Sequence, residues 1–146
     1  MKSKQKFYGK IFAALITLSC VGTPASAAEA AKNVVAGRQY FMRYCASCHG
    51  VDGTGNGPAA KSLAIPPADL RRLGDKYGMP LPAARLADVI DGRHTVRAHG
   101  SHEMPVWGER LYSSPAGNRG EKGISDVLSK IITYLNSIQD RRTAQR

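Results

Sequence analysis

The feature that most constrains this chain is the five-residue run Cys45-Ala46-Ser47-Cys48-His49. Two thiols that are separated by two residues and followed directly by a histidine have the spacing for covalent haem attachment. This spacing lets both sulfur atoms reach opposite edges of one porphyrin face, while the histidine projects toward its centre. A chain of this composition would contain the pattern by chance about twice in a thousand cases. The run therefore predicts one haem c, bound covalently through Cys45 and Cys48 and ligated to iron by His49.

Three other interpretations of the cysteine pair compete with haem. A redox-active pair of the thioredoxin type is expected in a strand-rich α/β chain, and alternating β-branched stretches are scarce here. A zinc site would need two further ligands, which could come from His94, His99 and His102. A lone cysteine pair in an oxidising compartment can also form a plain disulfide. The histidine directly after the second thiol favours haem over all three.

The N-terminus has the three-part pattern of a secretory signal peptide. Four lysines and no acidic residue lie in the first ten positions, Ile11–Val21 is apolar and uncharged, and Ala25-Ser26-Ala27 supplies small residues for cleavage. The apolar run has about half of the roughly 20 residues that a transmembrane helix needs. We therefore expect residues 1–27 to be a signal peptide and residues 28–146 to be one periplasmic domain without a membrane span.

Two alternatives exist at this end of the chain: an uncleaved membrane anchor, and a lipoprotein attached through Cys20. The lipoprotein is disfavoured because Thr17 stands where such signals usually have an aliphatic residue. Cleavage after Ala27 would leave about 120 residues, which is enough for one core and not for two.

The charge balance bears on the partners of the domain. The signal peptide holds four of the 21 basic residues and none of the 11 acidic ones, so the rest of the chain is still basic. A basic surface favours redox partner proteins with an acidic docking face, or an anionic membrane surface, because opposite charges steer encounter. Nucleic acid is disfavoured by export and by the lack of a basic stripe in the sequence.

Two amphipathic segments predict the first and last helices of an all-α domain. Residues 28–44 and 123–139 both place apolar side chains at helical spacing. Gly37 in the first segment costs about 1 kcal/mol of helix stability relative to alanine, so we expect the two helices to cross closely there. A third helix is predicted over Leu81–Asp91, beginning at Pro82 and ending at Gly92.

Two loops follow the cysteine motif. Gly50–Pro58 is dense in glycine and predicts tight turns rather than a phosphate cradle, because no strand precedes it. Ile65–Pro67 is predicted to be extended, with Asp69 capping a short helix after it. A haem-ligating histidine generally donates its second ring N–H to a carbonyl or a carboxylate. We expect a carbonyl within Ile65–Pro67 to accept this bond from His49.

The second axial ligand matters most for the redox chemistry, because ligation by histidine and methionine raises the reduction potential. Met104 is the leading candidate, since it lies between the last two predicted helices and the following proline stiffens the backbone. Met79 ranks second, because it precedes a helix that is still needed to close the pocket. Three histidines could also reach the iron: His94, His99 and His102. Trp107 is expected to pack either near the haem edge or in the core.

These residues together resemble the class I c-type cytochromes, particularly the bacterial mono-haem proteins with a glycine-rich stretch after the haem motif. The likeness runs from about Val34 to Ile138 and rests on Gly37, Phe41, the Cys45–His49 run, Gly57-Pro58, Pro66–Leu70, Met104–Gly108 and Tyr134-Leu135. The resemblance implies an all-α, cytochrome c-like fold whose N- and C-terminal helices cross near Gly37 and Tyr134. It also implies a haem pocket closed by a methionine-bearing loop, with His49 and Met104 as axial ligands.

The function that this resemblance implies is electron transfer in the periplasm, with one haem cycling between Fe(III) and Fe(II). Nothing in the sequence resembles a substrate pocket with paired acid and base, so an electron carrier is expected rather than an enzyme. One alternative is a haem c subunit of a dehydrogenase or oxidase complex, which should carry a large apolar patch beside the haem edge. The other is a sensor or peroxidase with an open iron, which would follow if Met104 does not ligate.

Overall fold

The structure is a computed structural model, and it describes residues 24–93, 104–115 and 120–140. In chain order its elements are α1 (Pro24–Tyr44), α2 (Ala46–His49), the 3-10 helices η1 (Ala60–Ser62) and η2 (Leu70–Arg72), α3 (Leu73–Tyr77), α4 (Ala83–Asp91), α5 (Trp107–Tyr112) and α6 (Glu121–Ser137). No strand occurs within the described ranges. This confirms the prediction of an all-α fold.

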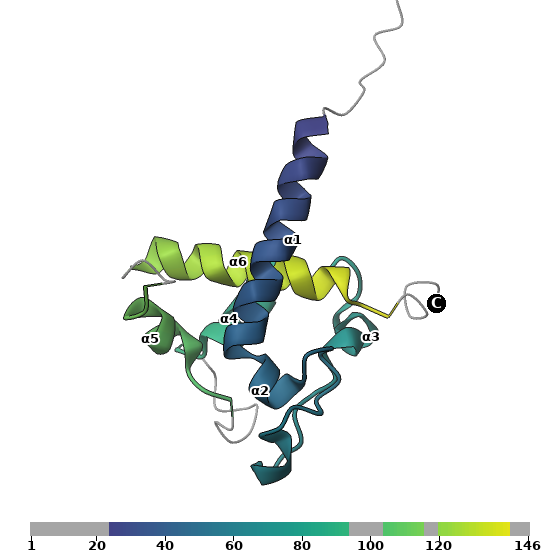
Figure 1. The fold of residues 1–146 in the computed structure, drawn as a ribbon, viewed down its shortest axis with the longest axis vertical. Helices are drawn as coiled ribbons and strands as arrows, with labels where there is room; N and C mark the ends of the chain where they lie inside the picture. The colour runs from purple at the N-terminus through teal and green to yellow at the C-terminus, as the bar shows by residue number, and fades with distance from the viewer. Residues whose placement is uncertain (1–23, 94–103, 116–119, 141–146) are drawn as a thin grey trace, which may run out of the picture.

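The crossing of α1 and α6 organises the domain (Figure 1). A Cβ atom at Gly37 would overlap the backbone carbonyl of Lys130 and lie 2.9 Å from the Cβ atom of Tyr134. One turn further along α1, the side chain of Phe41 is fully buried, and its ring centroid lies 5.2 Å from that of Tyr134. Only a residue without a side chain lets the two backbones approach so closely. The predicted crossing is confirmed, and so is the reason for its glycine.

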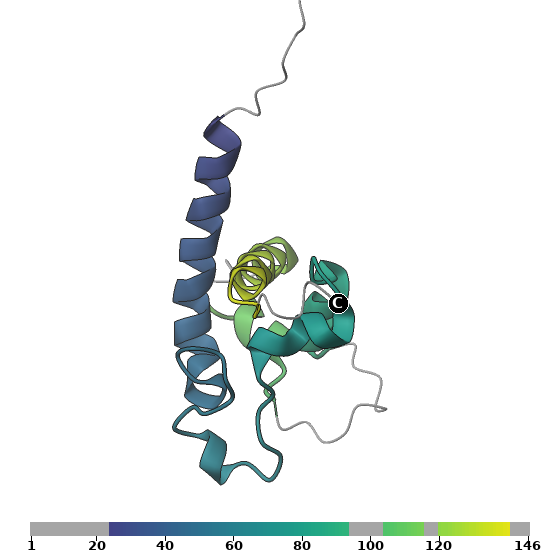
Figure 2. The same ribbon diagram turned by 90° about the vertical axis from the view of Figure 1, so that its right-hand side faces the viewer.

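The α6 helix contributes its whole apolar stripe to the core. Its buried side chains follow the helical spacing predicted from the sequence: Ile124, Val127, Leu128, Ile131, Ile132, Tyr134 and Leu135. Figure 2 shows α6 nearly end-on between α1 and α4. The α4 helix ends at Gly92 in the left-handed conformation, with φ of 73°, as predicted. The core is therefore a sandwich of α6 between α1 and the α4–α5 side.

The α1 helix begins at Pro24, before the cleavage site predicted after Ala27. Side chains from Ser26 to Lys32 are exposed, and this end of the helix projects beyond the crossing with α6 (Figure 1). Cleavage would therefore remove an exposed helix end and leave the core intact. None of the described helices is both long and apolar enough to span a membrane. The boundary after residue 27 stays a prediction.

Candidate haem site

The cysteine motif follows directly on α1, the helix that crosses α6. Cys45 is the single residue between α1 and α2. Its N–H donates to the carbonyl of Phe41 at 2.8 Å, and its own carbonyl accepts from the N–H of His49 at 2.9 Å. The helical path therefore continues through the motif, one turn beyond the buried ring of Phe41. The crossing with α6 thus sets the position of the motif.

Both cysteines of the motif are free thiols and are partly exposed. Burial, together with a smaller effect of the charge of the neighbouring Cys48, raises the pKa of the Cys45 thiol to about 12. Catalytic thiols of the thioredoxin type have a lowered pKa, because the thiolate is the reacting form. The protonated Cys45 thiol and the all-α fold both contradict the thioredoxin interpretation. The two cysteines are not bridged to each other.

The ring of His49 is oriented by a backbone carbonyl. Its Nδ1–H donates to the carbonyl oxygen of Ala68 at 3.1 Å, which leaves Nε2 to bind a metal. Burial lowers the pKa of His49, although the bond to Ala68 partly opposes this. A lowered pKa favours the neutral imidazole at physiological pH, and this is the form that ligates iron.

The prediction that Ile65–Pro67 supplies this carbonyl is wrong by one residue. The carbonyl of Pro67 lies against Gly55 instead, at the position that a Cβ atom of Gly55 would occupy. The next carbonyl, that of Ala68, is then the one that bonds to His49. Asp69 caps η2 as predicted, because its carboxylate accepts the N–H of Arg71 at 3.0 Å. The direction of the chain after Pro67 therefore determines that the Ala68 carbonyl, and not the Pro67 carbonyl, bonds to the His49 ring.

The glycine-rich loop ties the motif to the Ala68 segment. The N–H of Gly55 donates to the carbonyl of His49 at 2.8 Å, and that of Gly57 donates to the carbonyl of Cys48 at 3.0 Å. The carbonyl of Gly53 accepts from the N–H of Leu70 at 2.7 Å. Gly55 adopts φ of +87°, which side chains rarely allow. The loop thus holds His49 and its acceptor together, and it has the turns expected from the sequence.

The two candidate methionines lie on different sides of the motif. Met79 follows α3, is 43% exposed, and packs against Gly74 of that helix. Met104 is partly buried, packs against the core and leads into α5. Figure 1 places α3 and α5 on opposite sides of α2. Ala68, which accepts the bond from His49, precedes η2 and α3 in the chain, so Met79 comes from the side that already holds His49 and Met104 comes from the other side. This arrangement favours Met104 over Met79.

The three candidate histidines, His94, His99 and His102, lie outside the described residues. Within the described part of the chain, no group of three or more potential metal-binding side chains from His, Cys, Asp and Glu comes together. The zinc alternative therefore gains no support from the described ranges. Trp107 packs its ring on that of Tyr44, with 5.5 Å between centroids. Of its two expected positions, the structure shows contact with the core cluster.

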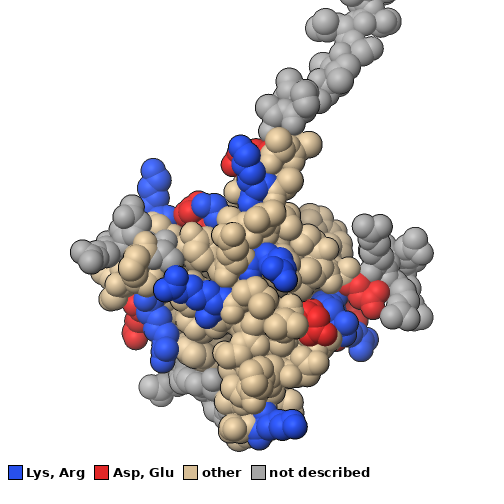
Figure 3. Space-filling model, viewed as in Figure 1, with Lys and Arg blue, Asp and Glu red and all other residues tan. Residues whose placement is uncertain are grey.

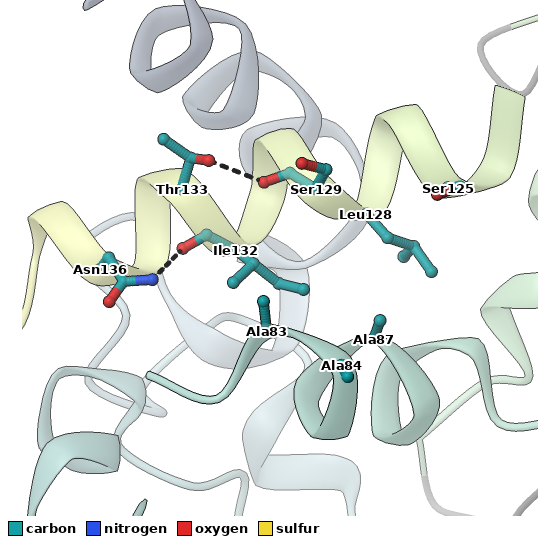
Figure 4. Close-up of a pocket in the computed structure, with 9 residues that line it drawn as sticks. All are labelled: Ala83, Ala84, Ala87, Ser125, Leu128, Ser129, Ile132, Thr133 and Asn136. Atoms are coloured by element: carbon teal, nitrogen blue, oxygen red, sulfur yellow. Dashed lines mark hydrogen bonds between the residues drawn. The ribbon is translucent and has the colours of Figure 1, made fainter. Parts of the chain in front are cut away.

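A separate hollow of about 320 Å³ lies between α4 and α6 (Figure 4). Alanine side chains of α4 face hydroxyl-bearing side chains of α6 across it. The hydroxyl of Thr133 donates to the Ser129 carbonyl at 2.9 Å, and the amide of Asn136 donates to the Ile132 carbonyl at 3.1 Å. The Asn136 oxygen also accepts from the N–H of Leu81 at 3.0 Å. No thiol, imidazole or thioether lines the hollow. It is therefore distinct from the haem motif in position and in chemistry.

A model of the cytochrome c family matches residues 34–139, which include the cysteine motif, the Ala68 segment and the crossing of α1 and α6. The chain belongs to the cytochrome c family. Comparison with curated proteins and with solved structures gives no match. Membership of the cytochrome c family indicates haem c binding and haem-based electron transfer. The described residues of this cytochrome fit that cofactor, because two unbridged thiols stand beside a histidine that is already oriented by Ala68.

Proposed function

We propose that this cytochrome is a periplasmic electron carrier with one covalent haem. The observation that supports this most directly is the fixed ring of His49, one residue from a free thiol and bonded through Nδ1 to Ala68. The N-terminal leader pattern supports export. A carrier needs a rigid ligand set rather than a substrate pocket, because small changes in geometry on electron transfer keep the reaction fast.

We assign four side chains to the cofactor in this proposal. Cys45 and Cys48 would form the two thioether bonds, His49 would ligate iron through Nε2, and Met104 would ligate from the opposite side. Haem supplies a one-electron Fe(III)/Fe(II) couple when bound, and a methionine ligand raises its potential. Phe41 of α1 and Ala46 within the motif are both buried, so the motif adjoins the apolar core.

The Met104→Ala variant tests the ligand set. We expect it to retain covalent haem, to lose the far-red charge-transfer band of methionine-ligated Fe(III), and to have a lower reduction potential. Visible spectra of the oxidised and reduced protein measure the first two effects, and a redox titration measures the third. Met79→Ala is the matched control, and it should leave the band in place because Met79 lies on the α3 side.

Two results would contradict this assignment. If the band disappears in Met79→Ala and persists in Met104→Ala, the two methionines have been assigned in the wrong order. If the wild-type protein has haem but no such band, a histidine or an open iron is indicated. The sensor or peroxidase alternative would then be preferred.

The docking surface that we propose surrounds the motif on the face shown in Figure 3. Lys and Arg side chains lie over α1 and toward α5 on this face, while acidic side chains lie mainly toward its sides. Arg43 stacks over the ring of Tyr44 at 5.5 Å, and Arg110 stacks over Trp107 at 5.9 Å. Tyr44 directly precedes Cys45, and its ring contacts that of Trp107, so both arginines lie close to the motif. A partner with an acidic face would therefore be attracted to this part of the surface.

The electron-transfer rate with an acidic redox protein should fall as ionic strength rises, because salt screens the attraction. We expect the Arg43→Gln, Arg110→Gln double variant to be slower by about tenfold at low salt. Stopped-flow kinetics over a salt series measures this. Arg85→Gln is the control, since Arg85 stacks over Tyr77 at 5.2 Å in the same way but on another part of the surface. A rate that does not depend on salt would contradict an acidic partner and would favour the subunit of a redox complex.

A further inference from the structure

A buried ion pair lies where α4 ends. Asp91 is 8% exposed and is the only charged residue classed as buried in the described part of the chain. The guanidinium of Arg93 bonds both of its carboxylate oxygens, with Nε to Oδ1 at 2.7 Å and Nη2 to Oδ2 at 2.7 Å. The backbone N–H of Arg93 also donates to Oδ1, at 3.1 Å. These three hydrogen bonds between Asp91 and Arg93 fix the backbone immediately after α4.

The same guanidinium reaches the first residue of α6. Its Nη1 and Nη2 donate to the two carboxylate oxygens of Glu121 at 2.6 and 2.8 Å. Both carboxylates raise the pKa of Arg93 above its already high ordinary value, so this side chain is charged. Because the Arg93 side chain is only 23% exposed, its bonds are partly shielded from solvent. The bonds of Arg93 to the two carboxylates therefore contribute more than a fully exposed ion pair would.

The start of α5 covers this ion pair. A Cβ atom at Gly108 would overlap both the guanidinium of Arg93 and the carboxylate of Asp91, and would lie 2.7 Å from the Cγ atom of Asp91. A Cβ atom at Gly92 would lie 3.4 Å from the Cα atom of Val106. The chain just after α4 and the chain at the start of α5 are thus in direct contact. Met104 lies two residues before Val106.

We propose that Asp91, Arg93 and Glu121 position Met104 to hold the haem iron by fixing the backbone on both sides of the segment that carries it. This inference rests on the proposed function, in which Met104 ligates iron. Holding both ends of a segment removes much of the conformational freedom that the segment would otherwise lose on binding. A thioether whose backbone is already held in place stays bound more of the time. Asp91 and Arg93 are therefore positioning residues and not ligands.

The test compares Asp91→Asn, Arg93→Gln and Glu121→Gln in the exported protein with its haem attached. Asp91→Asn and Arg93→Gln each remove a charge-assisted bond of the buried Asp91, and each should raise the fraction of protein with Met104 dissociated at least about tenfold. Glu121→Gln removes a bond to a 67% exposed carboxylate and should change this fraction in the same direction by a smaller factor. The readouts are the pH at which the far-red methionine band disappears and the rate at which carbon monoxide binds to the reduced protein. Both respond to the methionine and not to the overall fold.

Arg72→Gln is the matched control, because it removes an arginine–carboxylate pair of 3.0 Å between η2 and Asp75 of α3. It should leave the band and the carbon monoxide rate unchanged. Arg93→Lys should restore the band in part, since it keeps the charge and loses the two-pronged bond. If Asp91→Asn does not fold, Glu121→Gln decides the question, because Glu121 is 67% exposed and its loss leaves the core intact.

The outcomes separate this inference from the proposed function. A wild-type protein without the band overturns Met104 as ligand, and with it both proposals. A wild-type protein with the band, together with variants that keep the same band, pH limit and carbon monoxide rate, overturns the positioning role alone. Lower thermal stability by circular dichroism with an unchanged band would also overturn it, because the ion pair would then be structural only.

Discussion

Replacement of both motif cysteines, Cys45→Ser with Cys48→Ser, is expected to abolish covalent haem attachment completely. Serine hydroxyls do not form the thioether bonds, and the free thiols of this pair are the groups placed for them. The measurement is the intact mass of the exported protein, together with haem staining after denaturing electrophoresis. The wild-type protein should carry the mass of one haem, and the double variant none.

Cys20→Ser is the control for this experiment. Cys20 lies in the predicted signal peptide, so its replacement should change neither the haem content nor the mass of the mature protein. The same mass spectra report whether cleavage follows Ala27. Covalent haem that survives in the double variant would contradict the assignment of the motif, and a wild-type protein without haem would revive the disulfide or metal interpretations.

Gly37→Ala is expected to destabilise the folded protein by about 3 kcal/mol, which is at the upper end for one added methyl group in a packed site. The new Cβ atom would overlap the carbonyl of Lys130, which belongs to the backbone of α6 and has little room to move. The whole of α6 would have to shift away from α1. Urea unfolding followed by circular dichroism gives the change in free energy of unfolding.

The direction of the Gly37→Ala effect distinguishes packing from helix propensity. Alanine alone would stabilise an isolated helix by about 1 kcal/mol relative to glycine, so a more stable variant would contradict the close crossing. Gly120→Ala is the control, because a Cβ atom there meets nothing within 4 Å and the backbone is extended, with φ of −176°. Its stability should match that of the wild-type protein within about 0.5 kcal/mol.

Structural features that are set by residues close together in the chain could be predicted from the sequence. The α6 stripe follows from apolar spacing, the end of α4 follows from Gly92, and the cysteine motif follows from the spacing of thiols and imidazole. Even the crossing was predictable, because glycine in the middle of a helix is costly unless another backbone lies against it. Each of these signals lies within a few residues, where backbone geometry links sequence directly to structure.

The tertiary structure decided which distant groups meet. The acceptor for His49 is 19 residues away, and a turn after two prolines makes it Ala68 rather than Pro67. Opposite charges at Asp91 and Arg93 were visible in the sequence, but the pattern is common, and their link to Glu121 spans 28 residues. The two methionines are each followed by proline, but they come from different sides of α2, and only Met104 packs against the core. Local sequence determined the motif and the helices because their geometry is set by near neighbours, whereas packing of the whole chain determined how the motif is supported.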